Sequence, residues 1–142
     1  MKILAITTFY PHPERKDLLR DTSAVHYIAR EWVKQGHQVT VLHCYGHYFR
    51  ELVKELGKHD FRRYGKIQEC PNNEGVRVLL LEEQFWLRNA KWYLPVQQKK
   101  MAVAINQYFH EKEYEPDVLL VHFPTNYVGI VERLDIHCKK AA

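Results

Sequence analysis

The chain has 142 residues, of which 46% are hydrophobic and 27% charged, and its formal net charge is +4. This length suits one domain and this balance predicts a soluble globular core, which excludes a disordered tail, a collagen-like fibre and a low-complexity linker. No apolar run approaches the roughly 18–20 residues that span a bilayer, and the first residues lack the features of a signal peptide. We therefore expect a cytoplasmic protein in which Cys44, Cys70 and Cys138 are free thiols.

The first part of the chain predicts a strand, a loop, a helix and a second strand. Residues 2–9 are apolar and β-rich, and two nearby prolines end this run. The polar segment 11–21 is long for a loop in a compact domain, which is typical of functional loops. Apolar residues recur at helical spacing over 25–33, and Gly36 follows as a C-terminal cap. Residues 38–44 form the second strand and complete a βαβ unit.

The remaining sequence continues this alternation. We expect a short amphipathic helix over 47–58, a turn at Asn72 and Asn73, a strand over 75–81, a helix over about 96–112, a strand over 118–122, a helix over 126–134 and the start of a fifth strand at 136–138. Alternating strands and helices predict an α/β fold, a Rossmann-like open and mostly parallel sheet with helices on both faces. Ligands bind beyond the carboxyl ends of such strands, which points to the loops 10–22, 45–47 and 123–126.

The common phosphate-binding motifs are missing from the sequence, since it has neither GxGxxG nor GxxxxGK[ST]. Thr22 and Ser23 precede the first helix, where they either cap it only or offer a general anion site. His43, Cys44 and His47 are close in sequence but lack the paired spacing of zinc ligands, so we expect no metal site.

His122 ends the strand predicted over 118–122. From this position a histidine either orients or deprotonates a ligand hydroxyl near neutral pH, or it is a structural or surface residue. Both interpretations are open at the level of sequence.

Basic residues concentrate over 50–66, which hold six Lys or Arg against three acidic residues. Together with the aromatic residues of 85–93, this tract forms either a weak contact with an anionic membrane or a solvated helix face beside a core cluster. The residues that would face a membrane are Arg50, Lys54, Arg62, Arg63 and Lys66. We expect no nucleic-acid partner, because the glycine-spaced aromatic residues of RNA-binding strands are missing.

Three ordered segments resemble the GT-B glycosyltransferases of the family-4 type. They are ILAITTFYP at 3–11, TSAVH at 22–26 with EWVKQGHQVTV at 31–41, and PDVLLVHFP at 116–124. In that family a Tyr-Pro loop follows the first strand, Gly-His-(Glu/Gln)-Val-x-Val follows a helix, and the fourth strand carries Pro-Asp-hydrophobics-His-x-Pro. The resemblance covers most of the chain. It departs from the family at Thr22-Ser23, which stand where Gly-Gly is common in the first loop.

The resemblance implies one shortened half of a GT-B fold, the amino-terminal acceptor-binding part of a retaining glycosyltransferase. A nucleotide-sugar would be its co-substrate, held by a carboxyl-terminal donor domain that the sequence lacks, and no other cofactor is implied. The acceptor would be a glycan or a lipid-linked sugar of a cell-surface polysaccharide, collected at the inner face of the membrane. His122 matches the family's motif histidine, which positions hydroxyls near the reacting carbon. The residues implied to line the acceptor and donor loops are Tyr10, Pro11, His12, Thr22, Ser23, His26, Phe123, Pro124 and Thr125.

The alternative is a freestanding Rossmann-like module that binds a sugar, a nucleotide or a protein without catalysis. A small flavodoxin-like protein fits less well, because the first loop lacks the phosphate cradle that flavin mononucleotide needs.

Overall fold

The computed structural model describes residues 1–12, 24–49, 61–87, 90–122 and 128–141. Its elements, in chain order, are β1 (Lys2–Thr7), α1 (Ala24–Lys34), β2 (Gln38–Tyr48), the 3-10 helix η1 (Phe61–Arg63), β3 (Ile67–Asn73), β4 (Val76–Phe85), the 3-10 helix η2 (Lys91–Tyr93), α3 (Leu94–Glu111), β5 (Val118–His122), α4 (Val128–Val131) and β6 (Lys139–Ala141). The α/β class predicted from the sequence is confirmed.

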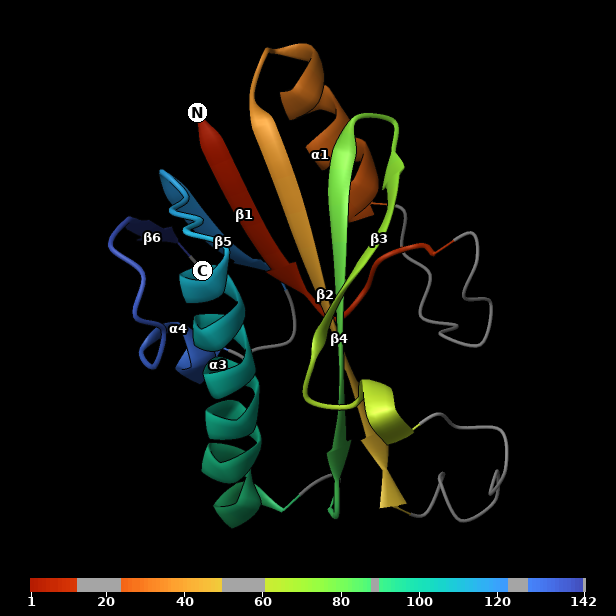
Figure 1. Cartoon of the computed structure of the whole chain (residues 1–142), viewed down its shortest axis with the longest axis vertical. Helices are drawn as coiled ribbons and strands as arrows, with labels where there is room; N and C mark the ends of the chain where they lie inside the picture. The colour runs from red at the N-terminus through yellow and green to blue at the C-terminus, as the bar shows by residue number, and fades with distance from the viewer. Residues whose placement is uncertain (13–23, 50–60, 88–89, 123–127, 142) are drawn as a thin grey trace.

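The described strands form one sheet in the order β3-β4-β2-β1-β5-β6. Every neighbouring pair is parallel except β3 and β4, which form an antiparallel hairpin. The chain moves to one side of β1 to make β2 and β4, and it returns to the other side to make β5 and β6 (Figure 1). The strand order therefore reverses between β1 and β5, and this reversal is the point at which open α/β sheets bind ligands.

Helices cover both faces of the sheet, as predicted (Figure 1). On one face α1 packs through Val25 and Ala29 against Ala5 and Val41. The opposite face carries the larger core, in which α3 and α4 cover side chains of β1, β2, β4 and β5. Side chains alternate between the faces along each strand, so neighbouring residues of β1 and β2 enter different cores.

Gly36 ends α1 as the sequence predicts. It has a positive φ of 86°, and its N–H donates to the carbonyl of Val33. A left-handed glycine at this position closes the helix without the steric cost that a Cβ would bring. None of the described helices is long and apolar enough to cross a membrane.

Two predictions about the middle of the chain are wrong. Residues 47 and 48 belong to β2 and not to a helix, because β2 pairs with β4 as far as Tyr48 and Phe85. Asn72 and Asn73 lie in β3, an unexpected strand, and the turn follows at Glu74 and Gly75, both with positive φ. The other residues of the helix predicted over 47–58 lie outside the described residues, apart from Phe49.

The last strand is also displaced from its predicted position. β6 begins at Lys139, after the predicted 136–138, and pairs in parallel with β5. Ile136 is instead buried in the core beneath α3 and α4. The apolar side chain of Ile136 thus reflects its burial in the core and not membership of a strand.

β2 extends well past the end of β1. It pairs with β1 only from Gln38 to His43, whereas its pairing with β4 continues from Thr40 to Tyr48. The carboxyl-terminal edge of the sheet is therefore stepped, with β2 and β4 projecting beyond β1 (Figure 1).

Candidate functional site

The carboxyl-terminal edge brings together side chains from three neighbouring strands. Thr7 ends β1, and its register partners are His43 on β2 and His122 on β5. Residues in register on parallel strands share a face, and this is the face that α1 covers, since Ala5 and Val41 pack there. His122 thus lies at the predicted position, half-buried at the point where the strand order reverses.

His12 and His43 form a hydrogen-bonded pair of imidazoles at this edge. Nε2 of His12 lies 2.7 Å from Nδ1 of His43, and the ring planes are inclined by 17° with centroids 4.8 Å apart, as expected for two imidazoles joined edge to edge by a hydrogen bond. Nε2 of His43 lies 3.0 Å from the carbonyl oxygen of Thr8, which can only accept. In its neutral form His43 therefore carries its hydrogen on Nε2, and His12 donates to its Nδ1. The neutral His12 ring then keeps the basic lone pair on Nδ1.

Tyr10 and His26 belong to a second hydrogen-bonded chain, which links the first loop to the β3–β4 turn. The Tyr10 hydroxyl lies 2.9 Å from Nδ1 of His26, and Nε2 of His26 lies 2.7 Å from Oε2 of Glu74. The hydrogen bond from His26, together with Arg30, holds the pKa of Glu74 below its ordinary value of 4.5. Burial raises the pKa of the Tyr10 hydroxyl, so it remains a donor. This series of hydrogen bonds holds the residues just before His12 in place.

The rings continue along β2, on the face that α1 covers. His43, Tyr45 and His47 alternate on this strand, with ring centroids 6.0 and 4.8 Å apart along the series. His47 bonds to the buried Glu82 of β4 at 2.9 Å and stacks on Tyr64. The rings at every second position of the sequence could have revealed this face, had residues 45–48 been assigned to a strand.

Several predicted site residues lie outside the described residues, namely Thr22, Ser23, Phe123, Pro124, Thr125, Arg50 and Lys54. Of the others, Tyr10, Pro11, His12, His26 and His122 lie close to the carboxyl end of β1 or beside α1. Arg62 and Lys66 are exposed and Arg63 is half-buried. They flank Gly65, whose N–H donates to the carbonyl of Glu82 on β4, so this tract lies beside the projecting part of the sheet. The described residues contain no group of side chains arranged to hold a metal ion.

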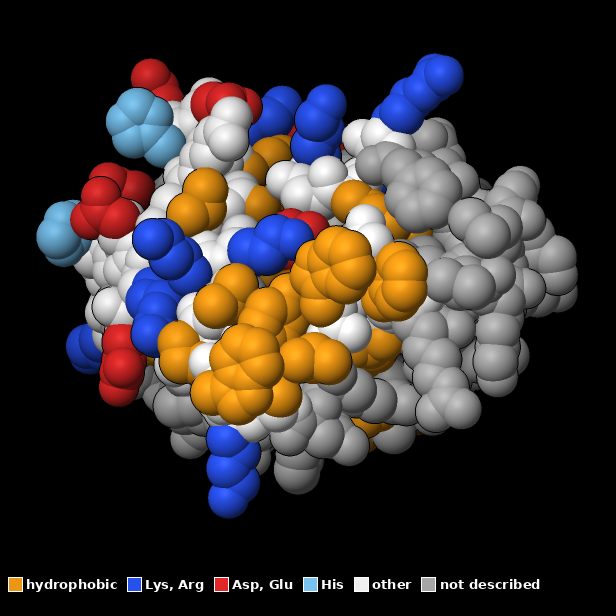
Figure 2. Space-filling view, turned by 90° about the horizontal axis from the view of Figure 1, so that it is seen from below, with side chains coloured by type: hydrophobic (Ala, Val, Ile, Leu, Met, Phe, Trp, Pro, Cys, Tyr) orange, Lys and Arg blue, Asp and Glu red, His pale blue; other side chains and the backbone are white. Residues whose placement is uncertain are grey.

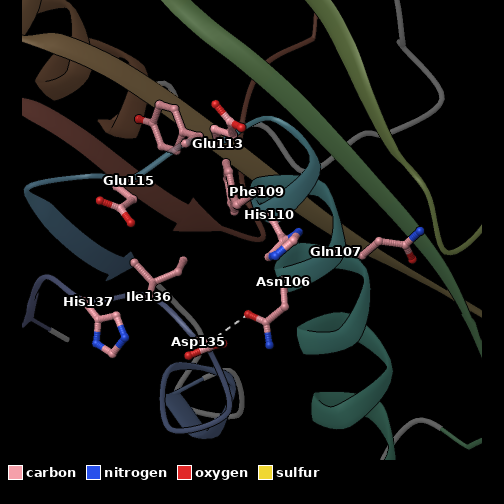
Figure 3. A pocket seen from close by; sticks show the side chains of 10 residues that line it. Asn106, Gln107, Phe109, His110, Glu113, Glu115, Asp135, Ile136 and His137 are labelled. Atoms are coloured by element: carbon pink, nitrogen blue, oxygen red, sulfur yellow. Dashed lines mark hydrogen bonds between the residues drawn. The ribbon is translucent and has the colours of Figure 1, made fainter.

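A pocket of about 700 Å³ lies at the opposite, amino-terminal edge of the sheet (Figure 3). α3 supplies one wall, and the segments leading into β5 and β6 supply the others. Asn106 holds the second of these segments, because it donates to the Arg133 carbonyl and accepts from the Asp135 N–H. The lining combines carboxylates, imidazoles and aromatic rings: Asn106, Gln107, Phe109, His110, Glu113, Tyr114, Glu115, Asp135, Ile136 and His137. The lining includes three carboxylates and neither Lys nor Arg, so this pocket is unsuited to phosphates. Sequence reasoning did not find this pocket.

Comparison with known proteins adds no assignment, since no family model, curated protein or solved structure matches the chain.

Proposed function

We propose that the chain is the acceptor-binding domain of a GT-B glycosyltransferase of the family-4 type, which transfers a sugar from a nucleotide-sugar with retention of configuration. The observation that carries this proposal is the position of His122, at the strand-order reversal and in register with Thr7. The motif histidine of the resembling segment thus ends the strand beside the crevice in which open α/β sheets bind ligands.

In this proposal an acceptor hydroxyl binds beside His122, whose imidazole orients it or takes its proton. A positioned general base contributes roughly 10²–10⁴-fold to a rate. The imidazole pair of His12 and His43 forms the other side of the same edge. The donor nucleotide-sugar would be held by a second domain, because neither phosphate-binding motif occurs in these residues.

The test is binding of the 142-residue protein to a glycan array, with His122→Ala and His137→Ala compared at equal concentration. His137 is an exposed histidine at the opposite edge and serves as the matched control. We expect selective glycan binding that His122→Ala lowers at least tenfold and His137→Ala leaves unchanged. In parallel, UDP- and GDP-sugars incubated with the protein should not be hydrolysed, and turnover above the buffer blank would contradict an acceptor-binding role.

A non-catalytic sugar-binding module is the second candidate, and the pocket at the amino-terminal edge favours it. Aromatic rings with carboxylate and amide groups suit a polyhydroxyl ligand, and Phe109, Asn106 and Asp135 supply these groups. The same array separates the candidates. Glycan binding that is lost in His137→Ala and kept in His122→Ala would favour this pocket.

A further inference from the structure

Large apolar side chains are exposed at the lower end of the molecule, where β2 and β4 finish. Trp92 is 74% exposed and Trp86 64% exposed, and the ring of the exposed Phe49 lies against that of Trp86. Viewed from below, this surface shows clustered hydrophobic side chains with Lys and Arg at its border (Figure 2). We define the aromatic patch as Phe49, Trp86, Leu87, Trp92 and Val96, all of which are exposed.

The patch is held in place by the fold. Phe49 and Trp86, which follow the ends of β2 and β4, stack with ring centroids 4.9 Å apart and planes inclined by 24°. Gln97 of α3 donates to the carbonyl of Leu87 at 2.7 Å, which attaches the segment after β4 to the helix. Trp86 therefore extends from an ordered framework, and little of its side-chain freedom is lost when it is covered, while Trp92 contacts the ring of the buried Tyr93.

The chain segment that carries most of the patch is rich in basic residues. Between Glu83 and Glu111 the sequence contains four Lys or Arg residues and no Asp or Glu. Lys91 and Lys99 are exposed beside the patch, and Lys100 binds Glu83 at 3.2 Å. A groove of about 510 Å³ joins Val96 and Lys99 to Gly65, which brings the exposed cations of the η1 segment, Arg62 and Lys66, next to the same surface.

We propose that the aromatic patch docks the protein on an anionic lipid bilayer. Tryptophan prefers the headgroup region, where its ring is partly buried and its N–H stays hydrated, and lysines nearby attract acidic headgroups. Tryptophan and phenylalanine also suit a protein interface, but the exposed Lys91 and Lys99 favour an anionic lipid surface, because protein interfaces are depleted in lysine. The membrane contact expected from the basic tract is thus centred on Trp86 and Trp92, with Arg62 and Lys66 at its border. This inference does not depend on the sugar chemistry proposed above.

Co-sedimentation of the full 142-residue protein with lipid vesicles tests the proposal. One vesicle preparation contains phosphatidylcholine alone and the other contains one-third phosphatidylglycerol. The variants are Trp86→Ser with Trp92→Ser, and Lys91→Gln with Lys99→Gln. The matched control is Tyr27→Ser with Lys34→Gln, which removes a 54% exposed aromatic ring and an exposed lysine from α1. Quenching of tryptophan fluorescence by brominated lipid reports insertion directly.

We expect binding to the anionic vesicles that falls at least tenfold in either patch variant and when salt rises from 50 to 500 mM, because the Debye length shortens from about 14 to about 4 Å. The α1 control should bind like the parent, and the fluorescence of the parent should be quenched by the brominated lipid. Equal binding to both vesicles, no binding to either, or full binding by the tryptophan variant would each overturn the proposal. A dimer in lipid-free solution that the tryptophan variant dissociates would assign the patch to a second copy of the chain instead.

Discussion

Nε2 of His12 lies 2.7 Å from Nδ1 of His43, although 31 positions separate the two residues in the chain. Because the Thr8 carbonyl fixes the hydrogen of His43 on Nε2, the pair also fixes which nitrogen of His12 is protonated when both rings are neutral. A ligand at this edge would therefore meet an imidazole of defined tautomer.

We expect both rings to show these tautomers near pH 8, with protonated Nε2 and unprotonated Nδ1. Two-dimensional ¹⁵N–¹H spectra of the imidazoles report this directly, and His12→Ala assigns the signals. A protonated Nδ1 on His43 at this pH would contradict the arrangement.

Tyr10→Phe should destabilise the protein by about 1–3 kcal/mol, because it removes the hydroxyl bonded to Nδ1 of the buried His26 and leaves a buried acceptor without this donor. Urea unfolding measures the change. Tyr27→Phe is the control, since Tyr27 is exposed on the same helix as His26, and its effect should stay within about 0.5 kcal/mol. Equal effects of the two substitutions would show that the Tyr10 hydroxyl contributes nothing.

Glu74→Gln should change how stability depends on pH. The pKa of Glu74 is lowered in the folded protein, chiefly by the hydrogen bond from His26, so this carboxylate contributes stability above pH 4.5 and loses it as the pH falls through its folded value. The parent should be more stable than the variant at pH 6, and the difference should shrink below pH 4.5. Unfolding free energies measured between pH 3 and pH 7 test this, and a difference that is constant with pH would refute it.

Gly46→Ala should cost about 1–3 kcal/mol, although alanine suits a strand better than glycine does. A Cβ at this position would lie 2.8 Å from Cε2 of the fully buried Phe85 ring. Adding Phe85→Leu should relieve the clash, so the two substitutions should be less damaging together than the sum of their separate effects. Additive losses in a double-mutant cycle would show that the loss of stability does not come from contact with the Phe85 ring.

The sequence predicts the elements whose apolar pattern matches their final burial. β1 is buried from Ile3 to Thr7, α1 buries Val25 and Ala29 but leaves Ile28 exposed, and β5, which is mostly half-buried, spans the residues that the pattern indicates. β3 could not be predicted, because it is an edge strand with the polar sequence IQECPNN, none of whose side chains is buried. The end of β2 was mistaken for a helix since Phe49 continues a spacing that also suits a helix.

The candidate site could be predicted only where position along a strand decides it. The sequence indicates His122, because a histidine at the end of a buried strand lies at the sheet edge. The bonds from His12 to His43 and from His26 to Glu74 depend on how the loop after β1 crosses the sheet, which no local pattern specifies.

The step at the end of β1 gives the carboxyl-terminal edge of the sheet two unlike sides. Along β2 and β4 a hydrogen-bonded ladder continues from His43 to Tyr48, so pairing with β4 holds the backbone of Tyr45 and His47. We therefore expect larger side chains at these two residues to lower the affinity for bulky ligands, because the paired backbone does not move aside to make room. On the other side, β5 ends at His122, in register with Thr7. Ligands that differ at one end only would therefore be distinguished by the end that faces β2.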